Sequence, residues 1–131
     1  MKKTGLLNHR LSDVVARMGH TQRLIVADAG LPVPLGVERI DLAIVPGQPL
    51  VIDVLRAIAS ELEVEELIVA DELIARDRSL AETASDMFGE APMRSVPHDE
   101  FKRLSEGAVA VIRTGECTPF ANVMLISGVT Y

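Results

Sequence analysis

Two residues that could take part in chemistry lie at the two ends of one short apolar run. In the stretch GHTQRLIVADAGLPVP, His20 comes before the run 24–27 and Asp28 comes directly after it. A histidine can donate and accept protons near neutral pH, and a carboxylate can accept hydrogen bonds from ligand hydroxyls. From the residues alone two interpretations remain open. Either His20 and Asp28 are solvated loop residues, or they are two parts of one site.

A second group of candidate residues lies in the segment RTGECTPFAN, residues 113–122, between two strongly apolar runs. The amide of Asn122 offers both a donor and an acceptor, which suits a sugar hydroxyl. Phe120 offers an apolar face for the C–H side of a sugar ring. The alternative interpretation is an ordinary polar connection with one anchoring ring. Cys117 has no base near it in the sequence, and we interpret it as an inert thiol.

The remaining candidates are histidines, and the familiar cofactor motifs are absent. His98 precedes two acidic residues, so a solvated helix start is the alternative to a role in ligand binding. We interpret His9 only as a solvated surface residue.

The chain contains no phosphate-binding loop, no dinucleotide-binding glycine set, no G-x-S-x-G motif and no zinc-spaced Cys/His pairs. The sequence therefore predicts neither a cofactor nor a metal ion.

The elements that must position these residues alternate between helices and strands. Apolar spacing predicts helices at about 11–18, 51–58, 79–88 and 99–104. Apolar runs predict strands at 24–27, 39–45, 64–70, 93–97, 108–113 and 122–127. We therefore predict an α/β fold, a three-layer sandwich around a mixed, partly parallel sheet, in a single domain spanning residues 1–131. Ligands of such sheets gather at the carboxyl ends of strands, where Asp28 and the segment after Arg113 lie.

Composition narrows the class of protein. The chain has 131 residues, of which 48% are hydrophobic, and a formal net charge of −6. An acidic chain is a poor ligand for nucleic acid or anionic membranes, and no apolar run reaches the roughly 18 residues of a membrane span. A single cysteine and the lack of a signal peptide are typical of the cytoplasm. We expect a cytoplasmic protein that binds neither nucleic acid nor membrane.

Three long segments carry a resemblance to a known family. They are MKKTGLLNHRLSDVVARMGHTQRLIVADAGLPVP, RIDLAIVPGQP and AVIRTGECTPFANVMLISGV. The first and last contain GHTQRLIVADAGLPVP and RTGECTPFAN, which are similar to the family signatures GHTDxxxxADAGLPxP and RTGExTPYAN. The chain thus resembles the D-ribose pyranases, a family related to the fucose mutarotases. The resemblance covers almost the whole chain and is weakest over about 70–93.

The resemblance implies a function, a site and an assembly. The family has an α/β sandwich fold and interconverts the pyranose and furanose forms of D-ribose without cofactor or metal, which feeds ribose utilisation. Its catalytic histidine corresponds to His20. Its sugar-binding residues correspond to Asp28, His98, Phe120, Ala121 and Asn122. The family also implies a homo-oligomer, a decamer of two pentameric rings, with sites formed between neighbouring subunits.

The chain departs from the signatures at two residues. Gln22 replaces the family's aspartate, which we interpret as a peripheral change. Phe120 replaces a tyrosine, which keeps the ring but loses the hydroxyl and leaves other functions open. The alternatives are a mutarotase of fucose or another aldose, and a sugar-binding protein with little catalysis. A strand also rises about 3.3 Å per residue, which keeps His20 and Asp28 apart. Either the loops bend back, or a neighbouring subunit supplies one of the two residues.

Overall fold

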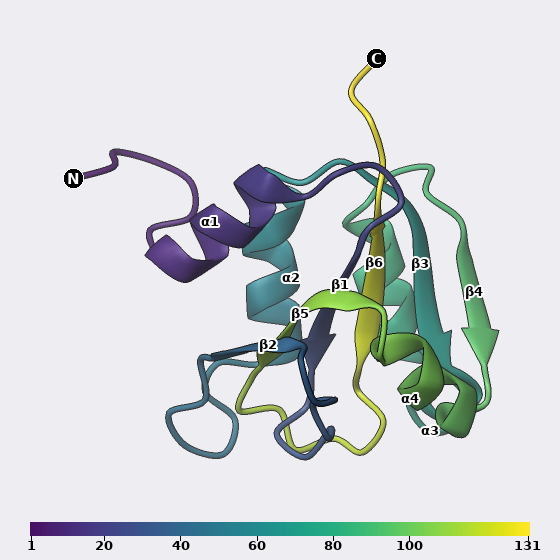
Figure 1. Cartoon of the computed structure of the whole chain (residues 1–131). Helices are drawn as coiled ribbons and strands as arrows, with labels where there is room; N and C mark the ends of the chain where they lie inside the picture. The colour runs from purple at the N-terminus through teal and green to yellow at the C-terminus, as the bar shows by residue number, and fades with distance from the viewer.

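The computed structural model describes residues 1–131 and contains six strands and four helices (Figure 1). In chain order they are α1 (His9–Arg17), β1 (Arg23–Ala27), β2 (Glu38–Asp41), α2 (Val51–Ala59), β3 (Val64–Ala70), α3 (Asp71–Asp86), β4 (Met93–Val96), α4 (His98–Ser105), β5 (Ala108–Arg113) and β6 (Val123–Ser127). The N-terminal segment extends away from α1, and the C-terminal segment extends beyond β6 (Figure 1).

The strands form one sheet in the order β2-β5-β1-β6-β3-β4. β6 runs antiparallel to its neighbours β1 and β3, and the other pairs are parallel, so the predicted mixed sheet is confirmed. Ala27 at the end of β1 pairs with Arg113 at the end of β5. Because parallel strands end at the same edge, the segments that begin with Asp28 and Thr114 leave the sheet side by side. Thr114 strengthens this junction by donating from its hydroxyl to the Ala27 carbonyl at 2.8 Å.

The sheet lies between helices, as the three-layer prediction requires. Side chains of successive strand residues point to opposite faces. In β1, Leu24 and Val26 belong to the larger core, which α1, α2 and α3 cover. Ile25 and Ala27 belong to a smaller core on the other face, where Phe101 of α4 is fully buried. Both faces of β1 are therefore apolar, which explains its continuous apolar run.

Two elements differ from the sequence-based expectation. β2 ends at Asp41 instead of residue 45, because the Asp41 side chain accepts the Ala43 N–H at 3.0 Å and turns the chain. The apolar residues that follow leave the sheet, and Ile44 is 78% exposed. α3 begins at Asp71 instead of about residue 79, with a kink at Asp77. The Asp77 side chain accepts the Leu80 N–H at 3.0 Å, so the predicted helix corresponds to the segment after the kink.

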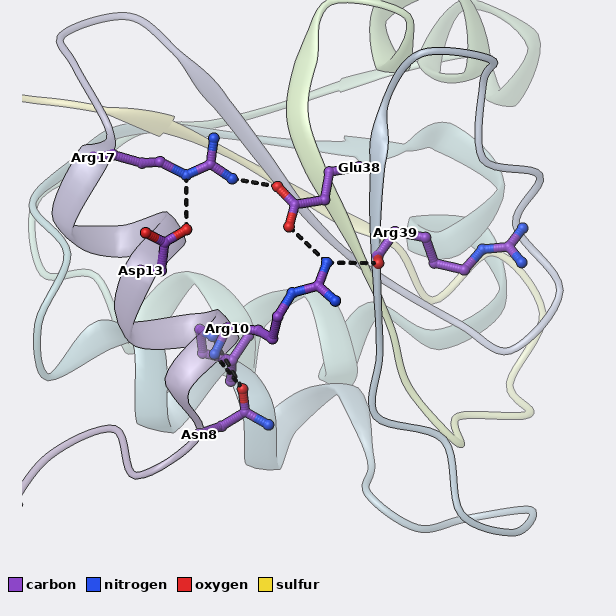
Figure 2. Close-up of polar contacts among 7 residues, drawn as sticks. Asn8, Arg10, Asp13, Arg17, Glu38 and Arg39 are labelled. Carbon is purple, nitrogen blue, oxygen red and sulfur yellow. Dashed lines mark hydrogen bonds and ion pairs between the residues drawn. The ribbon is translucent and has the colours of Figure 1, made fainter. Parts of the chain in front are cut away.

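A polar network fastens α1 to the edge strand β2 (Figure 2). Asn8 caps α1, as the sequence predicts, by accepting the N–H groups of its first turn. Glu38 lies between two arginines of α1: Arg10 donates to it at 2.7 Å, and Arg17 donates to its other oxygen. Hydrogen bonds from Arg10 and then Arg17 hold the pKa of Glu38 below its usual range.

Candidate functional site

An open pocket of about 480 Å³ lies beyond the carboxyl ends of β1 and β5. Its volume falls in the range of small-molecule sites, about 300–1,000 Å³. The lining residues come from the loop after β1, the start of α4 and the connection between β5 and β6; they are Asp28, Ala29, Gly30, Leu31, Pro32, His98, Glu116, Cys117, Thr118, Pro119, Phe120 and Asn122. The fold thus brings four of the residues predicted for the site together: Asp28, His98, Phe120 and Asn122.

Asp28 is held by contacts from its own turn and from Asn122, the residue just before β6. Its Oδ1 accepts the Gly30 N–H at 2.9 Å, which is the local turn contact that the sequence allows. Its Oδ2 accepts from the Asn122 amide nitrogen at 3.1 Å. A carboxylate can accept about four hydrogen bonds, so both oxygens retain capacity for ligand hydroxyls. Asp28 is therefore both a turn residue, bonded to its own loop, and a residue that lines the pocket.

Asn122 serves mainly to hold Asp28. Its side-chain oxygen accepts the Asp28 N–H at 2.9 Å, while its nitrogen donates to the carboxylate. Asn122 is only 1% exposed, although it lines the pocket. This pairing fixes both the backbone and the carboxylate of Asp28, which the sequence alone did not predict.

His98 and Phe120 form the aromatic side of the pocket, and Phe101 supports His98 from the core. The ring of His98 stacks on Phe101, with centroids 6.4 Å apart, and meets the edge of Phe120 at 5.0 Å. Its Nδ1 is buried and has no hydrogen-bond partner. Nε2 is therefore the ring nitrogen that a ligand in the pocket can reach. His98 begins α4 and also lines the pocket, so it is not simply a solvated residue at the start of a helix.

Phe120 and Ala121 occupy a constrained part of the same connection. Phe120 has a φ of 65°, in the left-handed region that residues with side chains rarely adopt. The Asn122 N–H donates to the Phe120 carbonyl at 2.7 Å, which helps to hold this conformation. Strain of this kind gathers at functional sites. Ala121 is fully buried, belongs to the larger core and does not line the pocket.

His20 lies at the other end of β1 from the pocket. The five residues of β1 at a rise of about 3.3 Å each span roughly 16 Å. The side chain of His20 is half exposed, and its Nε2 contacts Glu65 Oε2 at 2.8 Å. The loops do not bend back, so within one chain His20 and Asp28 do not share a pocket.

Two carboxylates near the pocket escaped the sequence-based prediction. Glu116 is 6% exposed and accepts the N–H groups of Thr118 at 3.2 Å and Val51 at 3.4 Å, which ties the pocket wall to the start of α2. Glu72 of α3 accepts the His98 N–H at 2.9 Å. Glu116 lies within the RTGECTPFAN motif and could have been chosen there. Glu72 carries no local signal, because its partner is 26 residues away.

Arg113 supports the pocket from the end of β5. Its guanidinium donates to the Ala29 carbonyl at 2.9 Å and to both carboxylate oxygens of Asp41. The Ala43 N–H and then Arg113 lower the pKa of Asp41 below its usual range. Nε and Nη1 of Arg113 thus join the end of β5 to the loop after β1 and to the end of β2.

Neither a metal cluster nor a membrane span is found among residues 1–131. No three His, Cys, Asp or Glu side chains gather in a way that suits a metal ion. None of the helices has the length and apolar character needed to cross a bilayer.

Comparison with known proteins places the chain in a family. The sequence model of the RbsD / FucU transport protein family matches residues 1–130. The chain belongs to this family. It is 51% identical to a D-ribose pyranase of Symbiobacterium thermophilum and 49% identical to one of Laribacter hongkongensis, each over 100% of both chains. The resemblance inferred from the two motifs is therefore confirmed.

Solved structures of similar proteins share the fold. The structure of Bacillus subtilis RbsD complexed with D-ribose is 45% identical, covers 100% of both chains and gives a TM-score of 0.95. A fucose mutarotase of Streptococcus pneumoniae in complex with L-fucose gives a TM-score of 0.81 over 95% of both chains, at 20% identity. At this low identity, the similarity to the fucose mutarotase shows a shared fold and says nothing about the site.

Proposed function

We propose that this chain is an isomerase that interconverts the pyranose and furanose forms of D-ribose, in support of ribose utilisation. The observation that carries the proposal is the full-length likeness to Bacillus subtilis RbsD, which was solved with D-ribose, at a TM-score of 0.95. The pocket chemistry supports it. Asp28 and His98 offer polar atoms to hydroxyls, and Phe120 offers an apolar ring to the C–H face of a sugar.

The reaction requires proton transfer and positioning. Opening the pyranose breaks the bond between C1 and the ring oxygen, gives that oxygen a proton and removes one from the anomeric hydroxyl. Closing the furanose reverses these steps at the 4-hydroxyl. A group that titrates near neutral pH suits both directions. We assign His20 as the general acid, Asp28 and His98 as the groups that hold sugar hydroxyls, and Phe120 as the ring that packs on the sugar.

Since β1 separates His20 from the pocket, the general acid must come from another copy of the chain. We propose that His20 of the partner subunit reaches the pocket that contains Asp28. A contact between unlike ends of two copies is head-to-tail, and such contacts form closed rings when the rotation closes. Exposed apolar residues support it: Ile44 and Val45 lie beside the pocket, and Tyr131 follows β6, which ends beside the start of β1.

The proposed assembly is the decamer of two pentameric rings that the family resemblance implies. We place it in the cytoplasm, because the acidic chain carries one free cysteine and no disulfide. Light scattering is expected to give a molecular mass about ten times that of one chain, as a decamer requires. A species near 14.2 kDa that retains activity would contradict the shared site.

Saturation-transfer NMR on ribose tests the activity directly. We expect wild-type protein to accelerate exchange between the ring forms, and His20→Asn to lose at least about 100-fold of this acceleration. His9→Asn is the matched control, because His9 is an exposed histidine. Undiminished exchange in His20→Asn excludes the assigned acid. Saturable binding without faster exchange favours the sugar-binding alternative, and faster exchange of fucose than of ribose favours the mutarotase alternative.

Mixing two inactive variants tests whether the site is shared. His20→Asn and Asp28→Asn are each expected to be inactive alone. In co-refolded rings a site is intact when an unaltered Asp28 faces an unaltered His20 of the partner subunit, so random mixing restores about a quarter of the sites. No recovery in mixed rings of the correct mass would contradict the shared site.

A further inference from the structure

Hydrogen bonds to β6 and within the turn hold the segment that carries His20 in one conformation. Thr21 has a φ of 66°, in the left-handed region. Its N–H donates to the Ser127 carbonyl of β6 at 2.8 Å. Gln22 closes the turn, because its side-chain oxygen accepts the Gly19 N–H at 2.7 Å. Unfavourable backbone geometry persists where the surroundings over-determine it, and it is typical of functional sites.

Glu65 is the only residue that contacts the ring of His20 through a hydrogen bond. The two side chains come from parts of the chain 45 residues apart and meet at 2.8 Å, Nε2 to Oε2. Glu65 lies on β3, a more rigid support than a loop. The segment after β6 packs against it, since a Cβ atom on Gly128 would lie 3.2 Å from Glu65 Cβ. No lysine or arginine contacts the Glu65 carboxylate, and His20 is its side-chain partner.

We infer that Glu65 is a positioning residue for His20, an inference that rests on the proposed function. A carboxylate on Nε2 holds a proton on that nitrogen and orients the ring. Nδ1 is then the nitrogen left to exchange a proton with the sugar in the pocket of the next subunit. The side-chain oxygen of Gln22 accepts the Gly19 N–H, so Glu65 is the residue whose carboxylate contacts the ring of His20.

The stability contribution of this pair is expected to be small. Both side chains are about half exposed, at 52% for His20 and 42% for Glu65. Exposed ion pairs contribute little to folding. Substitution of Glu65 should therefore change the reaction without unfolding the chain, which makes the inference testable in the intact assembly.

The experiment compares Glu65→Ala and Glu65→Gln with Glu63→Gln. Glu63 is an exposed glutamate two residues earlier on the same side of the molecule, and its removal changes the same charge. In ribose exchange we expect Glu65→Ala to lower kcat about 10–100-fold with KM changed less than twofold. Glu65→Gln keeps an oxygen that can accept from Nε2 and should restore part of kcat. Glu63→Gln should match wild type.

A spectroscopic readout separates this inference from the proposed function. The chain has three histidines, so ¹⁵N-histidine labelling with His→Asn variants assigns the His20 ring. Wild type should show the Nε2–H tautomer, and Glu65→Ala a mixture of both tautomers. A wild-type tautomer that persists in Glu65→Ala overturns the inference. An equal loss of kcat in Glu63→Gln also overturns it. Wild-type protein without ribose exchange refutes the proposed function alone, and the tautomer comparison still decides the role of Glu65.

Discussion

Asp28 and Asn122 hold each other by two hydrogen bonds across 94 residues of sequence. Asn122 accepts the Asp28 N–H at 2.9 Å and donates to its carboxylate at 3.1 Å. The contact exists because β1 and β6 are neighbours, with Val26 paired to Val123. A buried amide thus sets the direction in which the pocket carboxylate points.

Removing that amide is expected to weaken sugar binding. Asn122→Ala leaves the Asp28 N–H and one carboxylate oxygen without partners, and an unsatisfied buried group costs about 1–3 kcal/mol. We predict a loss of ribose affinity of at least about tenfold, measured by NMR titration. Asn122→Asp should lose more near pH 7, because two carboxylates then face each other. Ribose affinity equal to wild type in both variants would show that Asp28 does not need this support.

Restoring the family's hydroxyl tests the departure at Phe120. The ring of Phe120 meets His98 edge-on at 5.0 Å, so Phe120→Tyr extends an existing side of the pocket. One hydrogen bond contributes about 0.5–1.5 kcal/mol net, and we predict that kcat/KM for ribose exchange rises between about twofold and tenfold. Phe120→Leu is the companion variant, which removes the ring and should lower sugar affinity. No gain in Phe120→Tyr would mean that this chain works without the hydroxyl.

The fold could be predicted where apolar patterns are local. The continuous apolar runs of β1 and β5 and the stripe and cap of α1 follow from residues close in sequence. The prediction was wrong where side chains redirect the backbone. Asp41 turns the chain out of the sheet although apolar residues follow. Asp77 kinks α3, so that the periodicity revealed only the helix after the kink.

The site could be predicted only in part. Asp28 and Phe120 line one pocket because the strands that precede them, β1 and β5, are parallel and end at one edge, which the order of helices and strands indicates. The supports of the site could not be found from the sequence, because each joins distant segments. Glu72 meets His98 only because β3 and β4 pair, and Glu65 meets His20 only because of the turn beside β6. Contacts set by tertiary structure leave no periodic signal.

Glu72 is expected to position His98 through its backbone. α4 begins after Pro97, which supplies no capping side chain, and Glu72 accepts the His98 N–H at 2.9 Å in its place. Glu72→Ala should raise the KM for ribose about fivefold to tenfold, because His98 loses its place in the pocket. Glu72→Gln keeps an acceptor and should stay near wild type. Glu82→Ala, an exposed glutamate on the same helix, is the control. Equal KM values in all variants would contradict this role.

The network around Glu38 predicts how stability depends on pH. Its pKa is lowered from an ordinary value of 4.5 by Arg10 and Arg17. A carboxylate with a lowered pKa stabilises the folded state above its unfolded-state pKa, and this contribution is lost as the pH falls through the folded-state pKa. Glu38→Gln should therefore be less stable than wild type at pH 7, by roughly 0.5–1 kcal/mol for such exposed pairs. The difference should shrink below about pH 4.5.

Urea unfolding of both proteins between pH 3 and pH 7 measures this difference. Glu90→Gln provides the control, because Glu90 is exposed and has no ion pair. The Glu38 effect should also weaken in 1 M salt, where the screening length falls to about 3 Å. A difference that grows as the pH falls would show that Glu38 does not act through its two arginines.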